Sequence, residues 1–125
     1  VIYQHFVDFG SKPEDYDAVY TGDLGEVGKK ILLHLLRENG YDLSKVHGDC
    51  GIEIYENETQ DTHSGGSGCA CSAVVLASMN IPKLIDGTWK KVLFVPTGAL
   101  MSKTSFNEGE NVAGIAHAIL LEGVR

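Results

Sequence analysis

The sequence has no hydrophobic run long enough to cross a membrane. The longest apolar segment, Ala113–Leu121, is about half the length of a spanning helix, and it includes His117. The start of the chain also lacks the basic segment, apolar segment and cleavage site of a secretory signal. We therefore expect neither a transmembrane helix nor a signal peptide in this chain.

Basic residues and cysteines are both scarce. Lys and Arg number 10 against 17 Asp and Glu, which gives a formal charge of −7. An acidic surface repels phosphate backbones, so we expect no nucleic-acid partner. The three cysteines make an odd count without spaced pairs, which argues against a secreted disulfide scaffold and favours a reducing compartment.

The 125 residues suffice for one compact domain, and we treat residues 1–125 as a single domain. Apolar residues with helical spacing begin at Val1, with nothing before them to cap a helix. This pattern predicts that the chain is one part of a longer protein.

The order of apolar segments predicts an α/β fold with a sheet and packed helices. In the second helix, Asp23 is the predicted N-cap, with Glu26 completing a capping box. The segment Ala113–Glu122 is apolar on both faces, which is typical of a central strand. We expect strands at 17–22, 52–55, 91–97 and 113–122, helices at 1–9, 23–39 and 70–79, and long loops at 56–68 and 98–112.

The Gly/Ser-rich segment Thr62–Ser72 is the main candidate for a site. It leads into a predicted helix, whose free N–H groups favour an anion such as a carboxylate or phosphate. The alternative, with equal weight, is that the small residues only let a buried helix pack closely. The candidate ligand-binding residues are Thr62, His63, Gly65, Gly66, Ser67, Gly68 and Cys71.

Other candidate motifs have simpler structural explanations. Cys69 or Cys71 is a nucleophile if the helix N-terminus lowers its pKa, although a small buried cysteine is commoner. The Cys-x-Cys spacing does not complete a metal site, so we expect no metal. Gly22-x-x-Gly25-x-x-Gly28 departs from the dinucleotide-binding pattern and favours close helix packing. His117 is by default a core histidine, with a catalytic base as the alternative.

Several segments together resemble one known family. They are TGDLGEVG, DCGIEIY, GGSGCACSAVV, VLFVPTGAL and GIAHAILLE. Their order and spacing are similar to those of the C-terminal part of the stage V sporulation protein AD family, which belongs to the thiolase-like superfamily. The resemblance implies one half of a five-layer αβαβα fold, the C-terminal half, with the N-terminal half absent from this chain.

The resemblance also implies a degenerate catalytic site. Thiolases place a histidine in a G-H-P-x-G-x-S-G loop and a cysteine in a C-x-G turn. Here Thr62 falls at the histidine position, His63 lies one residue out of register, and Gly114 replaces the cysteine. A Claisen step needs a base, which Thr62 is not. His63 and His117 remain as weak candidates for a catalytic role.

The family resemblance implies a protein that binds dipicolinic acid and assists its uptake into the spore and its release on germination. Expected partners are the N-terminal half, the SpoVA membrane proteins and a second copy in a homodimer. The expected place is the forespore or spore, peripheral to the inner membrane. No cofactor is expected, and calcium only as the dipicolinate chelate. The alternative is an acyl-CoA-dependent acyltransferase of thiolase or ketoacyl-synthase type.

Overall fold

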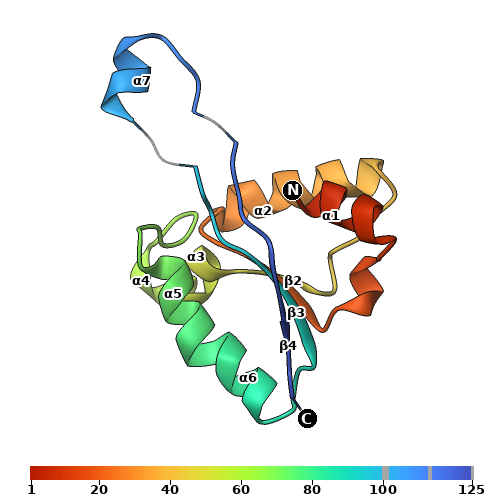
Figure 1. Cartoon of the computed structure of the whole chain (residues 1–125). Coiled ribbons are helices and arrows are strands. Elements are labelled where there is room, and N and C mark those ends of the chain that lie inside the picture. The colour runs from red at the N-terminus through yellow and green to blue at the C-terminus, as the bar shows by residue number, and fades with distance from the viewer. Residues whose placement is uncertain (100–101, 113, 125) are drawn as a thin grey trace.

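The computed structural model describes residues 1–99, 102–112 and 114–124. They form a sheet with helices on both of its faces (Figure 1). The elements in chain order are α1 (Ile2–Phe9), η1 (Pro13–Asp15), β1 (Ala18–Thr21), α2 (Gly25–Glu38), β2 (His47–Asp49), α3 (Cys50–Glu53), α4 (Asn57–Gln60), α5 (Cys71–Val75), η2 (Leu76–Asn80), α6 (Ile81–Ile85), β3 (Lys91–Val95), α7 (Lys103–Asn107) and β4 (Ile119–Glu122).

The sheet is mixed, with the strand order β2-β1-β3-β4, which confirms the predicted α/β class. Val19 of β1 lies opposite His47 of β2 and opposite Leu93 of β3, and both pairings are parallel. From β1 the chain moves to one side to form β2, then crosses back to form β3 on the other side. Ligands of parallel α/β sheets bind beyond the carboxyl ends of the strands at such a reversal. The topology therefore favours a site beyond β1 and β3.

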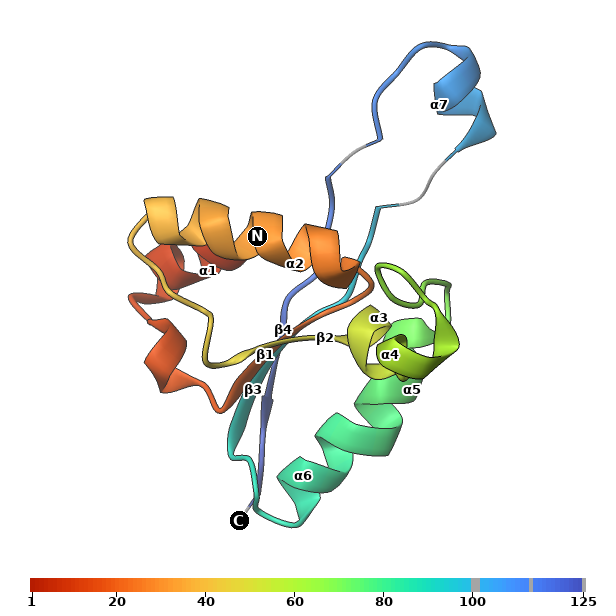
Figure 2. The same ribbon diagram turned by 180° about the vertical axis from the view of Figure 1, so that it is seen from behind.

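Alternate strand residues fill two separate cores, because successive side chains point to opposite faces of a sheet. Figure 2 shows α1 and α2 on one side of the strands and α3, α5 and α6 on the other. The core beneath α1 and α2 contains Ile2, Phe6, Tyr16, Val19, Leu36, Leu43, Leu93 and Val95. The core beneath α5 and α6 contains Ala18, Tyr20, Cys50, Cys71, Val75, Leu84, Val92 and Phe94.

The first helix and the strands β1 and β3 lie where the sequence predicts them. α1 ends at Phe9, and Gly10 takes the left-handed conformation, with φ 59°, that suits a residue after a helix. The longest α-helix, α2, has 14 residues. In the part of the chain that the structure describes, no helix combines the length and the apolar character needed to cross a bilayer.

The predicted strand at 52–55 is wrong. Its first two residues belong to α3, and the strand of this region is the preceding polar segment, β2, which the sequence places in a connection. Gly48 fits this strand because a Cβ there would lie 2.4 Å from the ring of Tyr20. A short alternating run such as Ile52–Tyr55 does not distinguish a strand from a helical turn, so the pairing with β1 decided the outcome.

The predicted helix at 70–79 continues to Ile85, through α5, η2 and α6. Pro82 does not end it, because a proline is tolerated in the first turn of a helical segment. The buried residues of this helix are Cys71, Val75, Asn80 and Leu84. The π-helical turn η2 adds one residue to the spacing between Val75 and Asn80, so both stay on the buried face. The opposite face is open to solvent, where Ile85 is 63% exposed.

Asn80 is buried without a hydrogen-bond partner for its side chain among the described residues. A buried amide without partners costs about 1–3 kcal/mol. We expect Asn80→Leu to raise the free energy of unfolding by about 1 kcal/mol, measured by urea denaturation. The exposed Asn107→Leu is the control and should change it by less than about 0.5 kcal/mol. A destabilised Asn80→Leu would contradict the expectation.

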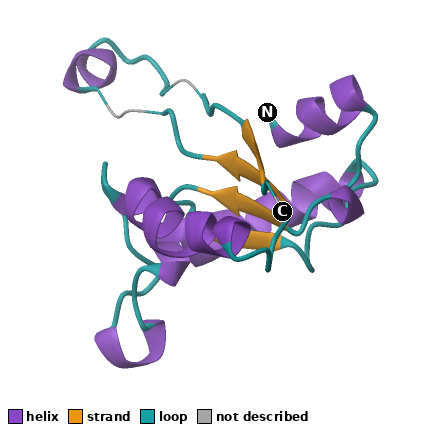
Figure 3. Ribbon diagram, turned by 60° about the horizontal axis from the view of Figure 1, so that its bottom comes forward, coloured by secondary structure: helices purple, strands orange, loops and turns teal. Residues whose placement is uncertain are grey.

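The last strand, β4, is an edge strand rather than the predicted central one. It pairs antiparallel with β3, and Ile119 and Leu120 remain 50% and 43% exposed. Ala113, at the start of the predicted strand, lies outside the described residues. Between β3 and β4 the chain forms an arm that carries α7 and stands away from the sheet (Figure 3). An apolar run shows which residues favour burial, but only the strand pairing shows whether a strand has a neighbouring strand on both sides.

Candidate functional site

The carboxyl ends of β1 and β3 meet at Gly22 and Thr97. A Cβ on Gly22 would lie 2.6 Å from the backbone nitrogen of Thr97 and 3.0 Å from the Oγ of Ser72. Glycine is therefore needed for β1 to approach both β3 and the start of α5. This contact lies at the chain reversal, where parallel α/β sheets bind ligands.

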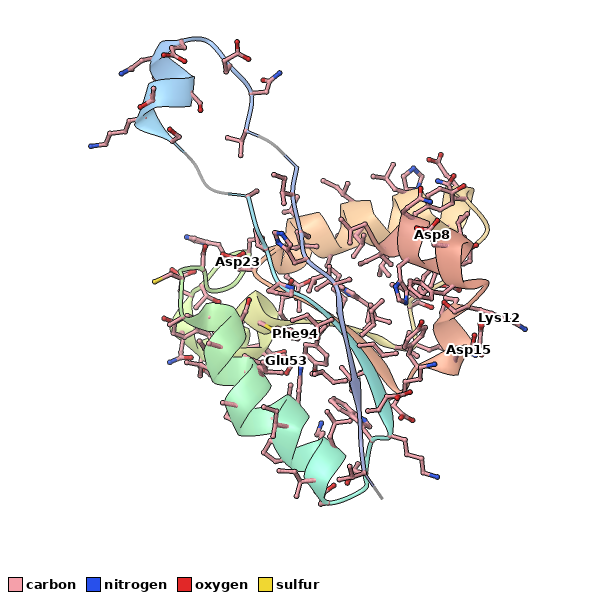
Figure 4. The ribbon with its side chains drawn as sticks, viewed as in Figure 1. Asp8, Lys12, Asp15, Asp23, Glu53 and Phe94 are labelled. Carbon is pink, nitrogen blue, oxygen red and sulfur yellow. The ribbon has the colours of Figure 1, made fainter. Side chains whose placement is uncertain are left out.

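Asp23 follows Gly22 and brings a carboxylate to this region. Its carboxylate accepts a hydrogen bond from the Ser67 hydroxyl at 2.5 Å and one from the Gly68 N–H at 3.4 Å. Figure 4 shows Asp23 between the start of α2 and the loop that precedes α5. Burial raises the pKa of Asp23, but the hydrogen bonds from Ser67, Thr97 and Gly68 together hold that pKa below its ordinary value. Asp23 is thus ionised at neutral pH.

The predicted role of Asp23 as the N-cap of α2 is wrong. Asp49, at the end of β2, binds the first N–H groups instead, with its two oxygens 2.9 Å from Leu24 N and 3.0 Å from Gly25 N. The predicted capping box is also absent, because the N–H of Glu26 donates to the Ser64 carbonyl. Because β2 is polar and does not have the pattern of a strand, nothing in the sequence indicates that Asp49 approaches α2. This arrangement leaves the Asp23 carboxylate free to face Ser67.

A series of hydrogen bonds between buried polar side chains links β2 to β1 next to Asp23. The Thr21 hydroxyl donates to Asp49 at 2.6 Å, so its oxygen accepts the bond from Nε2 of His47 at 2.9 Å. The Nδ1 atom of His47 is buried without a partner among the described residues. Burial, with a smaller contribution from the charge of Lys29, lowers the pKa of His47 to about 4. His47 is therefore neutral at physiological pH.

The loop Thr62–Gly68 is fixed by backbone contacts with two other segments. The Gly66 N–H donates to the Gly51 carbonyl at 2.6 Å, and Gly51 N–H donates to the Gly22 carbonyl at 3.0 Å. Ser64 binds the N-terminus of α2, with its carbonyl 2.7 Å from Glu26 N. A Cβ on Gly66 would lie 2.6 Å from Ile54, so glycine allows the loop to approach α3.

The candidate ligand-binding residues consequently separate into two groups. Ser67 and Gly68 contact Asp23 beside the ends of β1 and β3. Thr62 bonds instead to the Asn57 side chain, and His63 pairs with Asp61 at 3.5 Å with its own side chain 86% exposed. Gly65 and Gly66 serve the backbone contacts of the loop. All of these residues lie in one segment of the sequence, but in the structure they contact different parts of the molecule.

Two of the three cysteines, Cys50 and Cys71, are buried in the core beneath α5 and α6. Burial is the main cause that raises the pKa of both thiols, to about 12 for Cys50. Thiolates, rather than thiols, are the nucleophiles. This favours the interpretation of Cys71 as a small core residue. The remaining thiol, Cys69, is exposed.

His117 is an exposed residue of the arm, not a core histidine as the apolar run predicts. Its Nδ1 atom would lie 3.1 Å from a Cβ on Gly98, immediately after Thr97. His117 is therefore adjacent to the ends of the strands, while His63 lies on the outer side of the loop. Within residues 1–99, 102–112 and 114–124, no three His, Cys, Asp or Glu side chains are placed to hold a metal ion.

An apolar groove of about 540 Å³ begins at the same end of the sheet. Thr21 and Thr97 are among the residues that line it, and leucines of α2 form one wall. Residues of the arm and the first turn of α1 form the remaining walls: Val1, Ile2, Tyr3, Ala99, Gly114, Ile115 and Ala116. Thr97 lies two residues beyond the apolar strand β3, a signal in the sequence that could have identified it as a candidate.

Comparison with known proteins agrees with the order of these segments. Residues 1–122 match the family described as Stage V sporulation protein AD (SpoVAD). The chain belongs to the SpoVAD family. It is 44% identical over 121 residues to Stage V sporulation protein AD of Bacillus subtilis (strain 168). The aligned residues make up 97% of this chain and 36% of that relative. The chain thus spans about a third of the SpoVAD relative that it matches, and it is a sporulation protein by this membership.

Proposed function

We propose that this chain contributes to a dipicolinic-acid-binding protein that assists uptake of the ligand into the spore and its release on germination. The ligand would lie beyond β1 and β3, next to Ser67, Gly68 and Thr97. The Ser67 hydroxyl and the Gly68 N–H donate to the Asp23 carboxylate in the structure, so this position already binds one carboxylate. A carboxylate of dipicolinate would take these donors over from Asp23. Dipicolinate is a planar ring with two carboxylates, so it needs such donors on two sides.

The observation that carries this proposal is that the donors Ser67 and Gly68 lie together at Asp23, apart from the two buried thiols and from His63, although the exposed Cys69 follows Gly68 and His117 lies beside Gly98. Ser67 and Gly68 gather around Asp23, whereas the Cys50 and Cys71 thiols lie in the core with raised pKa values. His63 is paired with Asp61 at the surface. The region is therefore better suited to holding a ligand than to forming a covalent intermediate.

Exposed apolar surface supports the proposed partners. On α2, Val27 is 62% exposed and Ile31 is 55% exposed, and Ile85 of α6 is open on the other side of the molecule. Apolar patches of this kind are typical of interfaces. We propose that they contact an N-terminal half in a thiolase-like five-layer fold, a second copy in a homodimer, or SpoVA membrane proteins at the inner membrane of the spore.

The alternative function is an acyl-CoA-dependent acyltransferase of thiolase or ketoacyl-synthase type. The apolar groove supports it, since a groove of about 540 Å³ beside Thr97 has the size of an acyl-chain site. His117, next to Gly98, would act as the base. Turnover of an acyl-CoA thioester, lost in His117→Ala, would favour this function over ligand binding.

Titration of this chain with dipicolinate, with and without calcium, tests the main proposal. We expect saturable amide NMR shifts at Gly22, Ser67, Gly68 and Thr97. The calcium chelate is needed as a second titrant because ionised Asp23 repels a free carboxylate.

Ser67→Ala should weaken dipicolinate binding about tenfold, because it removes one donor to a charged group. Ser78→Ala is the matched control, since Ser78 is exposed on the helix η2. The dipicolinate affinity of this variant should be unchanged. Equal affinities of the two variants, or saturable shifts remote from these residues, would refute the proposed location.

A further inference from the structure

Asp49 is a buried carboxylate without a basic partner in the part of the chain described. It is 1% exposed, and none of the ion pairs found includes it. A buried charge is unfavourable unless hydrogen bonds replace its lost hydration. Asp49 obtains these from the Thr21 hydroxyl and from two N–H groups at the positive end of α2.

The three residues that donate hydrogen bonds to Asp49 lie on both sides of Asp23 in the sequence. Thr21 lies two residues before Asp23, and Leu24 and Gly25 follow it directly. Asp49 therefore holds both sides of the turn that carries Asp23. Because Asp49 binds the N–H groups of α2, the Asp23 carboxylate is left to accept bonds from Ser67 and Gly68.

The segment that follows Asp49 fixes the other half of this contact. Gly51 donates to the Gly22 carbonyl and accepts from Gly66, one residue before Ser67. A Cβ on Gly51 would lie 2.4 Å from the Gly66 oxygen, so the two backbones are in direct contact. Both residues that meet at the site, Asp23 and Ser67, are thus held by the end of β2 and the start of α3.

We infer that Asp49 is a positioning residue, which sets the contact between Asp23 and the Ser67–Gly68 loop without touching a ligand. Its effect on ligand affinity rests on the proposed function, whereas its effect on Asp23 does not. A residue that only capped α2 would change the stability of the fold and leave the contact of Asp23 unchanged in folded molecules.

The test is Asp49→Asn, which keeps the shape of the side chain but places an amide group against the N–H of Gly25. The direct readout is the pKa of Asp23, measured by carbonyl-carbon NMR of its side chain. We expect this pKa to rise toward its ordinary value, because the bonds from Ser67 and Gly68 are weakened. Loss of the Asp49 charge alone would lower the pKa of Asp23, so the sign separates positioning from simple electrostatics.

The second readout is dipicolinate affinity, which should fall about tenfold in Asp49→Asn. The control is Asp86→Asn, at an exposed carboxylate before β3, which should change neither quantity. Should Asp49→Asn fail to fold, Thr21→Val serves instead, because it keeps the shape of the side chain and removes the hydroxyl that donates to Asp49.

An unchanged or lowered pKa of Asp23 in folded Asp49→Asn would overturn the inference. A raised pKa together with weaker dipicolinate binding would support both the inference and the proposed function. A raised pKa in a chain whose unsubstituted form does not bind dipicolinate would support the inference and refute the proposed location of the ligand.

Discussion

Acidification from pH 6.5 to pH 4 is expected to lower the free energy of unfolding by about 3 kcal/mol through His47 alone. Burial lowers the pKa of this histidine from 6.5 to about 4 in the folded chain. Between these values the unfolded chain binds the extra proton and the folded chain does not, so stability falls as the pH falls. Each unit of difference contributes about 1.4 kcal/mol.

The cause lies in the surroundings of both ring nitrogens. Nε2 already donates to Thr21, and a proton on Nδ1 would be buried without an acceptor among the described residues. Asp49 acts in the opposite direction and raises the pKa, but less than burial lowers it.

Urea denaturation at several pH values measures this effect, with NMR titration of the His47 ring as a direct second measurement. His47→Gln should lose most of the dependence between pH 6.5 and pH 4, with a remainder from His5, whose pKa burial also lowers. His34→Gln, at an exposed position of α2, should keep the whole dependence. A His47 ring that titrates near pH 6.5 in the folded chain would show that the expectation is wrong.

Gly22→Ala is expected to destabilise the chain by about 1–3 kcal/mol and to disorganise the site. The new Cβ would lie 2.6 Å from both the backbone nitrogen and the Oγ1 of Thr97. Because a backbone atom does not move aside as a flexible side chain does, the ends of β1 and β3 must separate. The pairing of Thr21 with Val95 is the part of the ladder nearest to this strain.

Gly114→Ala is the matched control, since among the described residues, its chain neighbours apart, no atom lies within 4 Å of a Cβ at that position. Its midpoint of urea unfolding should equal that of the unsubstituted chain. In Gly22→Ala we expect a lower midpoint and shifted amide signals at Asp23 and Thr97. Identical midpoints in the two variants would contradict the close approach of β1 and β3.

The site could be located from the sequence only in part. The segment Thr62–Ser72 is recognisable as a Gly/Ser-rich approach to a helix, and Ser67 and Gly68 contact Asp23, two residues beyond β1. That these residues bind a ligand stays a prediction. Asp49 was not predicted, because its role depends on β2, which is polar. Thr97 was not singled out either, since nothing local shows that it meets Gly22, 75 residues earlier in the chain.

The α/β class, the family, the end of α1 at Gly10 and the apolar strands β1 and β3 can be predicted without the structure. These features depend on local spacing and composition, which do not require distant partners. The position of β2 before α3, the place of β4 at the edge of the sheet, and the binding of Asp49 rather than Asp23 to the start of α2 become visible only in the folded chain. Strand neighbours and buried hydrogen bonds are made by residues far apart in the chain, and their donors and acceptors must be satisfied wherever the fold brings them together.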